Sequence, residues 1–138
     1  MKNIFLDTSG MGHLFVQDQI FHESAFRLYF QRISHGAKVI LTNHIITEFV
    51  ALSASRLNLS RPGLIKIVND LYRSRFVEQV FIDKMLYERA WQLLCNRPDK
   101  AWSLVDCCSF IVMQDRGISD ALTTDHHFTQ AGFNVLLK

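Results

Sequence analysis

The sequence predicts an α/β fold of three layers, with helices on both faces of a central parallel sheet of about five strands. Two observations predict it. Short apolar segments alternate along the chain with longer segments whose apolar residues recur at the helical spacing. No repeat, low-complexity run or linker interrupts this alternation. Since 138 residues suit one compact domain, we expect residues 1–138 to form a single domain.

The expected strands are short apolar runs bounded by polar or turn-forming residues. They cover 3–7, 38–41, 77–82, 121–123 and 134–137. Runs of this length without helical periodicity are typical of the buried strands of a parallel sheet.

The expected helices occupy the segments between these strands. They cover 20–35, the segments that follow the capping residues Asn43, Ser60, Asp83 and Ser103, and a short turn over 126–131. Pro62 falls in the first turn of one of these helices, where its missing N–H costs little. Gly36, Gly117 and Gly132 follow three of the segments and are plausible helix-ending residues.

The composition is that of an ordinary globular protein, with 49% hydrophobic and 20% charged residues. The three cysteines are odd in number and two are adjacent, so no disulfide framework is expected. Asp7 occurs before any signal-peptide apolar region could form, and no apolar run reaches the roughly 20 residues of a membrane span. These features favour a cytoplasmic protein that does not enter a membrane.

Four acids far apart in the sequence map to one edge of the predicted sheet. Asp7 ends the first strand, and Asp125 follows the fourth strand by two residues. Glu48 lies five residues into the helix after the second strand, and Asp106 lies in the first turn of the helix that leads into the fourth. In an open parallel sheet, ligands bind at the carboxyl ends of the strands. We therefore expect these acids to lie together.

The sequence around these acids predicts a metal site. Asp7, Glu48 and Asp106 stand in apolar runs, where an acid is usually paired or bound to a metal. Two carboxylates about 5 Å apart repel by roughly 3 kcal/mol at an effective dielectric near 20. A divalent cation would relieve this repulsion, and ligation by oxygen alone favours Mg²⁺ or Mn²⁺ over Zn²⁺.

Four sequence motifs together resemble the PIN-domain family, and more narrowly the VapC-type toxins of toxin–antitoxin pairs. The motifs are Phe5-Leu6-Asp7-Thr8-Ser9, Asn43-x4-Glu48, Ser103-Leu104-Val105-Asp106, and Ala121-Leu122-Thr123-Thr124-Asp125-His126-His127-Phe128 followed by Ala131-Gly132-Phe133. Their order and spacing extend over nearly the whole chain.

The resemblance implies a PIN-like α/β/α sandwich and a metal-dependent endoribonuclease that acts as the toxin of a type II toxin–antitoxin pair. It implies Asp7, Glu48, Asp106 and Asp125 as the catalytic acids, of which Asp7, Asp106 and Asp125 would bind Mg²⁺ or Mn²⁺. The supporting polar residues would be Thr8, Ser9, Asn43 and Thr123. The implied partners are RNA, a cognate antitoxin and a second copy of the chain. His127 stands where many relatives have a further acid, which puts a second metal site in doubt.

Residues 51–76 form a basic segment, which provides the expected contact surface for RNA. It contains one acid, Asp70, and five cations: Arg56, Arg61, Lys66, Arg73 and Arg75. The excess over this segment is 5 − 1 = +4, while the chain as a whole carries only +2. A basic surface beside an acidic pocket suits a polyanion that must reach a bound metal. A solvated helix face is the alternative interpretation.

Several structural roles compete with catalysis. Ser103-x-x-Asp106 is also a helix-capping pattern, and Asp7 and Asp125 could each cap a short helix that follows them. Zn²⁺ bound by His126 and His127 is disfavoured, because adjacent residues on a helical turn diverge by about 100°. We expect the stripe Phe21–Phe30 to lie in the core, and Phe15, Val16 and Leu28 to form an apolar patch for a partner.

Two other functions fit less well. A phosphoacceptor signalling domain would need an acidic pair after the first strand, but Asp7-Thr8-Ser9 has one acid. A haloacid-dehalogenase-type phosphatase would need a second Asp where Ser9 stands. A catalytically silent PIN-like domain that binds RNA or protein stays open as the alternative, although the four retained acids argue against it.

Overall fold

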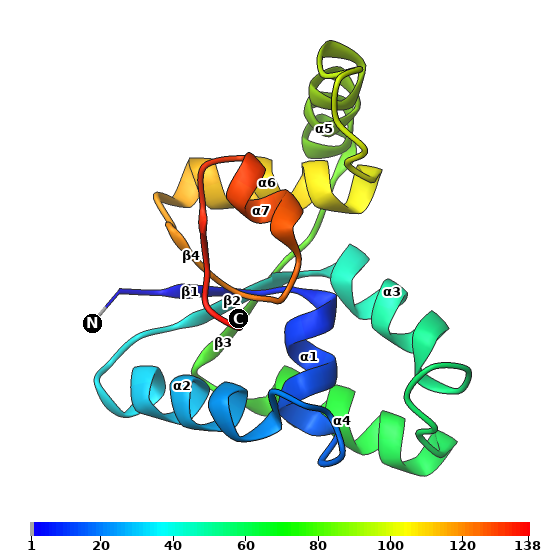
Figure 1. Cartoon of the computed structure of the whole chain (residues 1–138), viewed down its shortest axis with the longest axis vertical. Helices are drawn as coiled ribbons and strands as arrows, with labels where there is room; N and C mark the ends of the chain where they lie inside the picture. The colour runs from blue at the N-terminus through cyan, green and yellow to red at the C-terminus, as the bar shows by residue number, and fades with distance from the viewer. Residues whose placement is uncertain (1) are drawn as a thin grey trace.

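A computed structural model describes residues 2–138 and contains five strands and seven helices in these residues (Figure 1). The strands are β1 (Ile4–Leu6), β2 (Val39–Thr42), β3 (Val77–Val80), β4 (Asp120–Leu122) and β5 (Asn134–Val135). The helices are α1 (Thr8–Phe15), α2 (His22–Ser34), α3 (Asn43–Ser53), α4 (Arg61–Arg73), α5 (Lys84–Asn96), α6 (Leu104–Arg116) and α7 (His126–Gln130).

The five strands form one parallel sheet in the order β3-β2-β1-β4-β5. Ile4 of β1 pairs with Val39 on one side and with Asp120 on the other. The chain therefore adds strands to one side of β1 first and then to the other side. The order reverses at β1, which makes its carboxyl end the position where an open parallel sheet binds ligands.

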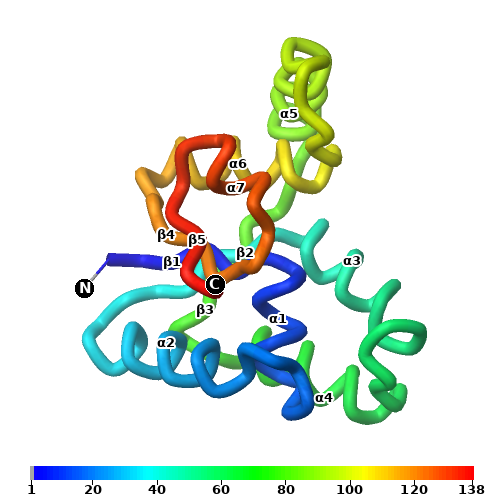
Figure 2. The backbone as a smooth tube through the Cα atoms, in the orientation of Figure 1, coloured from blue at the N-terminus to red at the C-terminus, as the bar shows by residue number. Residues whose placement is uncertain are grey.

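The reversal of strand order also explains the three layers. Crossovers between parallel strands are right-handed, so helices change face when the direction of winding changes. In Figure 1, α1, α2 and α4 lie on one side of the strands, and α6 and α7 lie on the other. The tube view in Figure 2 shows the same division, with α5 standing out from the body and the C-terminus beside the sheet. The expected α/β/α sandwich is confirmed.

The core packs on both faces of the sheet. The residues of β1 and β2 are all buried, as expected for central strands covered on both sides. On the α6 and α7 face, Phe110 meets Phe128 edge to face, with 5.0 Å between ring centroids. On the other face, α1 approaches β4 very closely. A Cβ atom on Gly10 would lie 1.9 Å from the backbone oxygen of Leu122, so only glycine fits there.

Two local expectations are wrong. Thr42, not Asn43, caps α3: its backbone is extended, and its Oγ1 accepts from the N–H of Ile45 at 3.2 Å. Asn43 is already the first helical residue, and its Oδ1 instead accepts from the N–H of Ile82 at 2.7 Å. Helix α1, foreseen only as a short helix that Asp7 could cap, begins at Thr8, and the Asp7 side chain makes no capping bond.

Part of the stripe Phe21–Phe30, which was expected in the core, lies on the surface, and this corrects a further expectation. Phe26 is 51% exposed and Phe30 is 49% exposed, and their rings lie 4.5 Å apart on the surface. Ala25 and Tyr29 are the buried residues of α2, and Leu28 and Ile33 are partly buried against the core. Val16, expected in a surface patch, is buried. Within residues 2–138, no helix combines the length and apolar character that crossing a membrane requires.

Candidate active site

The site lies at the carboxyl ends of β1 and β4. Asp7 follows β1 directly and is only 5% exposed. Its Oδ2 accepts a hydrogen bond of 2.8 Å from the hydroxyl of Thr123, the residue that follows β4. The backbone N–H of Asp7 also donates to Leu122 at 3.3 Å. The sheet therefore fixes the position of this carboxylate through two neighbouring strands.

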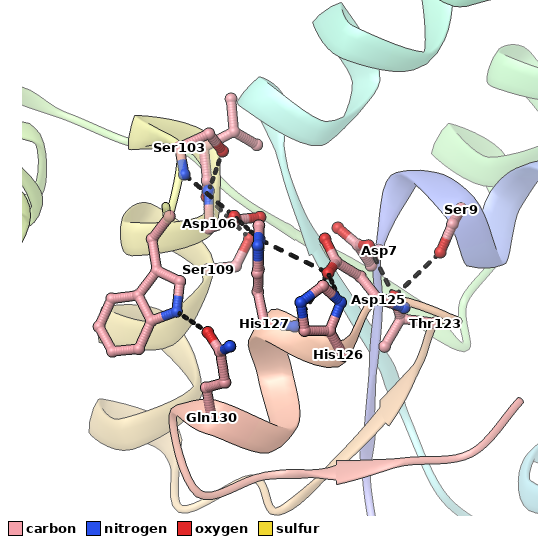
Figure 3. A network of polar contacts seen from close by, with 12 residues as sticks. Asp7, Ser9, Ser103, Asp106, Ser109, Thr123, Asp125, His126, His127 and Gln130 are labelled. Atoms are coloured by element: carbon pink, nitrogen blue, oxygen red, sulfur yellow. Dashed lines mark hydrogen bonds and ion pairs between the residues drawn. The ribbon is translucent and has the colours of Figure 1, made fainter. Parts of the chain in front are cut away.

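A chain of hydroxyl hydrogen bonds fixes the direction of each donor around Asp7. Thr123 has one hydroxyl hydrogen, which goes to Asp7. The Ser9 hydroxyl, 2.9 Å away, must therefore donate to Thr123. Ser9 in turn accepts from the N–H of Thr124, and Thr123 accepts from the N–H of Asp125. The two expected supporting residues Ser9 and Thr123 thus join α1 to the loop that carries Asp125 (Figure 3).

Glu48 enters the site from α3. Its Oε1 accepts a short hydrogen bond from the hydroxyl of Thr8, the first residue of α1. Glu48 lies on the second turn of a helix whose start is fixed by the end of β2, so its side chain reaches the same edge of the sheet as Asp7. Thr8 thus holds one oxygen of this acid.

Asp106 is held at the N-terminus of α6. Its Oδ2 accepts from the N–H of Ser103 at 3.0 Å, and the Ser103 hydroxyl accepts from the N–H of Asp106 at 3.0 Å. This reciprocal pair is a capping box. The same Oδ2 lies 2.9 Å from Nδ1 of His127 (Figure 3). The capping interpretation and the site interpretation are therefore compatible, because the cap uses one oxygen of Asp106.

Asp125 caps α7 and faces the same histidine. Its Oδ1 accepts from the N–H of His127 at 2.9 Å and lies 3.5 Å from Nδ1 of that residue. His127 is thus placed between Asp106 and Asp125 (Figure 3). The sequence marked His127 only as a departure from the family pattern. Its contact with Asp106 joins residues 21 positions apart and has no sequence signal.

The four acids share one arrangement. The side-chain hydrogen bonds engage a single oxygen of each carboxylate: Oδ2 of Asp7 and Asp106, Oδ1 of Asp125, and Oε1 of Glu48. The second oxygen of Glu48, Asp106 and Asp125 is left as a candidate ligand for a cation or for water. Carboxylates oriented in this way by surrounding donors are typical of metal sites, where such partners fix the ligands.

The raised pKa of Asp7 also supports a cation site. Burial raises the pKa of Asp7 to about 7. Hydrogen bonds from Thr123 and from the backbone of Thr8 oppose the rise, and the charges of Asp106 and Glu48 add to it. A buried carboxylate surrounded by other carboxylates needs a positive charge to ionise fully near neutral pH. The donor set is rich in oxygen and negative charge, so it fits a hard divalent cation.

A Zn²⁺ site has weaker support. Ligand atoms of Asp125, His126 and His127 lie within 4.8 Å of one another, and the two histidine rings are 4.7 Å apart. The expected divergence of the two side chains therefore does not separate them. However, Nδ1 of His127 already contacts Asp106, and His126 is exposed. The oxygen-rich cluster is the better cation site.

All four acids open into one cavity of about 500 Å³. Its lining contains Asp7, Thr8, Ser9, Gly12, His13, Gln19, Glu48, Leu52, Arg56, Leu57, Ala101, Ser103, Asp106, Asp125 and His127. The cavity thus continues from the acids along α1 and α3. His13, Gln19, Leu52 and Leu57 were not predicted as site residues. One signal was available, because Glu48, Leu52 and Arg56 are spaced four residues apart.

The basic segment is spread over more of the molecule than the cavity. Arg56 lines the cavity, whereas Arg61 and Lys66 lie on α4, where Lys66 pairs with Asp70. Arg73 ends α4 and Arg75 lies two residues before β3, so both lie near the amino edge of the sheet, opposite the acids. Asn43, expected as a supporting residue, does not line the cavity, and its hydrogen bond to Ile82 ties the start of α3 to the segment after β3.

Comparison with solved structures defines the class of protein. The chain superposes with a TM-score of 0.83 on the crystal structure of Mycobacterium tuberculosis VapC20, described as a Sarcin-Ricin loop cleaving toxin. The match has 28% identity and covers 99% of this chain and 100% of that one. A parallel five-stranded sheet with four acids at its switch point therefore has the architecture of a PIN-type nuclease.

Comparison with curated proteins defines the family. The chain is 33% identical over 130 residues to the 23S rRNA-specific endonuclease VapC20 of Mycobacterium tuberculosis, in the CDC 1551 / Oshkosh and H37Rv strains alike. The match covers 94% of this chain and 95% of each relative. No protein-family model matches the chain. The chain belongs to the VapC family of PIN-type toxin endoribonucleases.

Proposed function

We propose that this chain is an endoribonuclease that depends on Mg²⁺ or Mn²⁺ and hydrolyses RNA at the four-acid cluster. The observation that supports it best is the arrangement of these acids. They come from four separate elements, and the side-chain hydrogen bonds hold one oxygen of each. A purely structural role does not require four carboxylates around one cavity, since their mutual repulsion costs stability.

Asp7, Asp106 and Asp125 would hold the cation, with Glu48 beside it. When bound, the cation would neutralise the acids, polarise the phosphodiester and lower the pKa of a water molecule. Thr123, Ser9 and Thr8 keep the carboxylates in one orientation, so no rearrangement is needed when substrate arrives. Attack of water on phosphorus breaks the bond to O3′, which leaves a 3′-hydroxyl and a 5′-phosphate.

The substrate and partners follow from the relatives. Since VapC20 is named as an endonuclease specific for 23S rRNA, we propose a structured ribosomal RNA in the cytoplasm as the target. We propose also that residues 1–138 act as one domain, that a cognate antitoxin blocks the cavity, and that the chain forms a homodimer. The exposed pair Phe26 and Phe30 on α2 supports a protein contact of this kind, because adjacent exposed aromatic rings mark interaction surfaces.

Cleavage of a mixed single-stranded RNA and of a 23S rRNA hairpin tests the proposal. The purified chain is assayed with Mg²⁺, Mn²⁺ or EDTA beside Asp7→Asn, with Asp99→Asn as the matched control. Asp99 is a surface acid paired with Arg97. We expect metal-dependent cleavage that Asp7→Asn reduces by about 10³-fold or more and Asp99→Asn leaves unchanged. Cleavage that persists in EDTA or in Asp7→Asn would contradict the proposal, and the absence of cleavage with either metal would favour the silent binding module.

A further inference from the structure

We propose that the outer part of the cavity, between α1 and α3, is a subsite for one unpaired RNA base next to the phosphate that is cut. This inference rests on the proposed function. The subsite is lined by Gly12, His13, Gln19, Leu52, Arg56 and Leu57. These residues have no part in holding the four acids.

The α3 wall leads outward from the acids in helical steps. Glu48, Leu52 and Arg56 are four residues apart, and the N–H of Arg56 donates to the oxygen of Leu52 at 3.0 Å. This bond continues the helical spacing past the end of α3. Residues four apart lie on one helix face, about one turn or 5.4 Å along the axis. The wall therefore presents an acid, then an apolar side chain, then a cation.

The wall formed by α1 is open, because the residue one helical turn after Thr8 has no side chain. Thr8, which bonds Glu48, is followed one turn later by Gly12. A Cβ atom on Gly12 would lie 3.5 Å from a methyl group of Leu57, which is ordinary contact. Glycine is thus not forced here by crowding, unlike Gly10. Its effect is to leave space beside Leu57, within a cavity of about 500 Å³ that Leu52 also lines.

The rim of this space carries three polar side chains, of which His13 is held by a hydrogen bond. The N–H of Phe21 donates to Nδ1 of His13 at 3.3 Å, so Nδ1 carries a lone pair and the ring proton is on Nε2. Burial also lowers the pKa of His13, which favours this neutral form. Gln19 adds an amide, and Arg56 adds the one guanidinium among the described residues that line the cavity.

The combination fits a nucleobase best. Apolar walls accept the flat faces of a base, and a few polar groups at the rim read its edge. The subsite adjoins the acids within one cavity, so a base bound there belongs to a nucleotide whose phosphate reaches them. Arg56 at the outer end suits the negative backbone of the same strand. A bare cation has no reason to bind here, because the acids lie at the inner end.

Gly12→Leu tests the proposal by filling the subsite, and Ala51→Leu is the matched control. Ala51 is an exposed residue of α3 outside the cavity, so the same side chain is added without blocking it. Each protein is titrated with Mn²⁺ and with the four nucleoside 5′-monophosphates, and the ends of fragments from a randomised RNA are sequenced. Gln19→Ala provides a second variant if Gly12→Leu does not fold.

We expect wild-type protein to prefer one base beside the cut. Gly12→Leu should weaken binding of the preferred monophosphate about tenfold, a loss of roughly 1.4 kcal/mol, and flatten the base preference. In RNA cleavage by Gly12→Leu, the increase in KM should exceed any decrease in kcat, and the affinity for Mn²⁺ should be unchanged. Ala51→Leu should behave as wild type, and Gln19→Ala should alter the preference.

Three results separate the possibilities. If no monophosphate binds in a Gly12-dependent way and the base preference is absent or unaltered, the subsite is wrong and a protein segment becomes the better occupant. If Gly12→Leu lowers Mn²⁺ affinity as much as nucleotide affinity, the subsite is also wrong. If monophosphates bind in a Gly12-dependent way but no RNA is cut, the subsite stands and the proposed nuclease function fails.

Discussion

Asp7 carries a stability cost, which the cation-binding role proposed for it would explain. Its carboxyl group is buried among other acids, and its pKa is raised to about 7 from an ordinary value of 3.8. A raised pKa means that the folded state holds the proton more tightly than the unfolded state. The contribution of Asp7 to the free energy of unfolding is therefore greatest below pH 4, falls as the pH rises from about 4 to 7, and stays reduced above 7. Three pKa units correspond to roughly 4 kcal/mol as an upper estimate.

Asp7→Asn should therefore stabilise the metal-free protein at alkaline pH. The amide can still accept from Thr123, and it adds no charge to the site. In EDTA at pH 8, we expect its free energy of unfolding to exceed that of wild type by about 2–4 kcal/mol, and near pH 4 we expect the two to be equal. Urea unfolding at the two pH values measures this. A variant no more stable than wild type at pH 8 would show that the charge of Asp7 is compensated within the chain.

His127 illustrates a residue whose role depends on tertiary structure. It follows Asp125 by two residues, and its position within α7 was predicted. Its contact with Asp106 was not, because α6, which follows α5, and α7, which follows β4, must first be placed side by side. The four acids were predicted because each follows, or precedes, a strand in a way that the parallel sheet converts into proximity. His127, His13 and Gln19 follow no such rule.

At the scale of elements, α1 shows why one helix escaped prediction. Its sequence Thr8-Ser9-Gly10-Met11-Gly12 contains two glycines, and each costs about 1 kcal/mol in a helix relative to alanine. Local propensity therefore disfavours the helix. Packing forms it nonetheless, because Gly10 lets α1 approach the backbone of β4. The other helices have recognisable caps or apolar periodicity, and the sheet follows from the alternation of segments. Most of the fold was thus predictable.

The caps of α6 and α4 offer a matched pair of variants. Ser103 and Ser60 each accept from a backbone N–H three residues on, at 3.0 and 3.2 Å. Ser103→Ala and Ser60→Ala should each cost about 1 kcal/mol of stability. Only the Ser103 hydroxyl holds the backbone N–H of an acid of the site, Asp106, so only Ser103→Ala should also lower kcat for RNA cleavage, by about tenfold. Thermal unfolding and single-turnover cleavage measure the two effects. Equal activity losses in the two variants would mean that α6 positions Asp106 without its cap.

At the scale of the whole molecule, the position of each cation relative to the sheet decides its access to RNA. Phe76 and Val77 lie level with the start of β2, which pairs with Ile4 at the start of β1. Asp7 lies three residues further along β1, about 10 Å away at 3.3 Å per residue. Arg73 and Arg75 lie beyond Phe76 in the opposite direction, and the guanidinium of Arg75 packs on the ring of Phe76.

Charge reversal at the two ends of the basic segment should therefore have unequal effects. In an Asp7→Asn background, which keeps RNA intact, Arg56→Glu should weaken RNA binding by about tenfold and reduce the slope of log affinity against log salt by about 1. Arg73→Glu changes net charge by the same amount at the opposite edge, so its loss should be smaller and its salt slope nearly that of the parent. Filter binding from about 50 to 200 mM salt measures both slopes. Equal losses of RNA affinity in the two variants would mean that RNA wraps around α4 to the far edge of the sheet, as the basic composition of the whole segment first indicated. The rim of the cavity would then contribute no more to RNA binding than the rest of the basic segment.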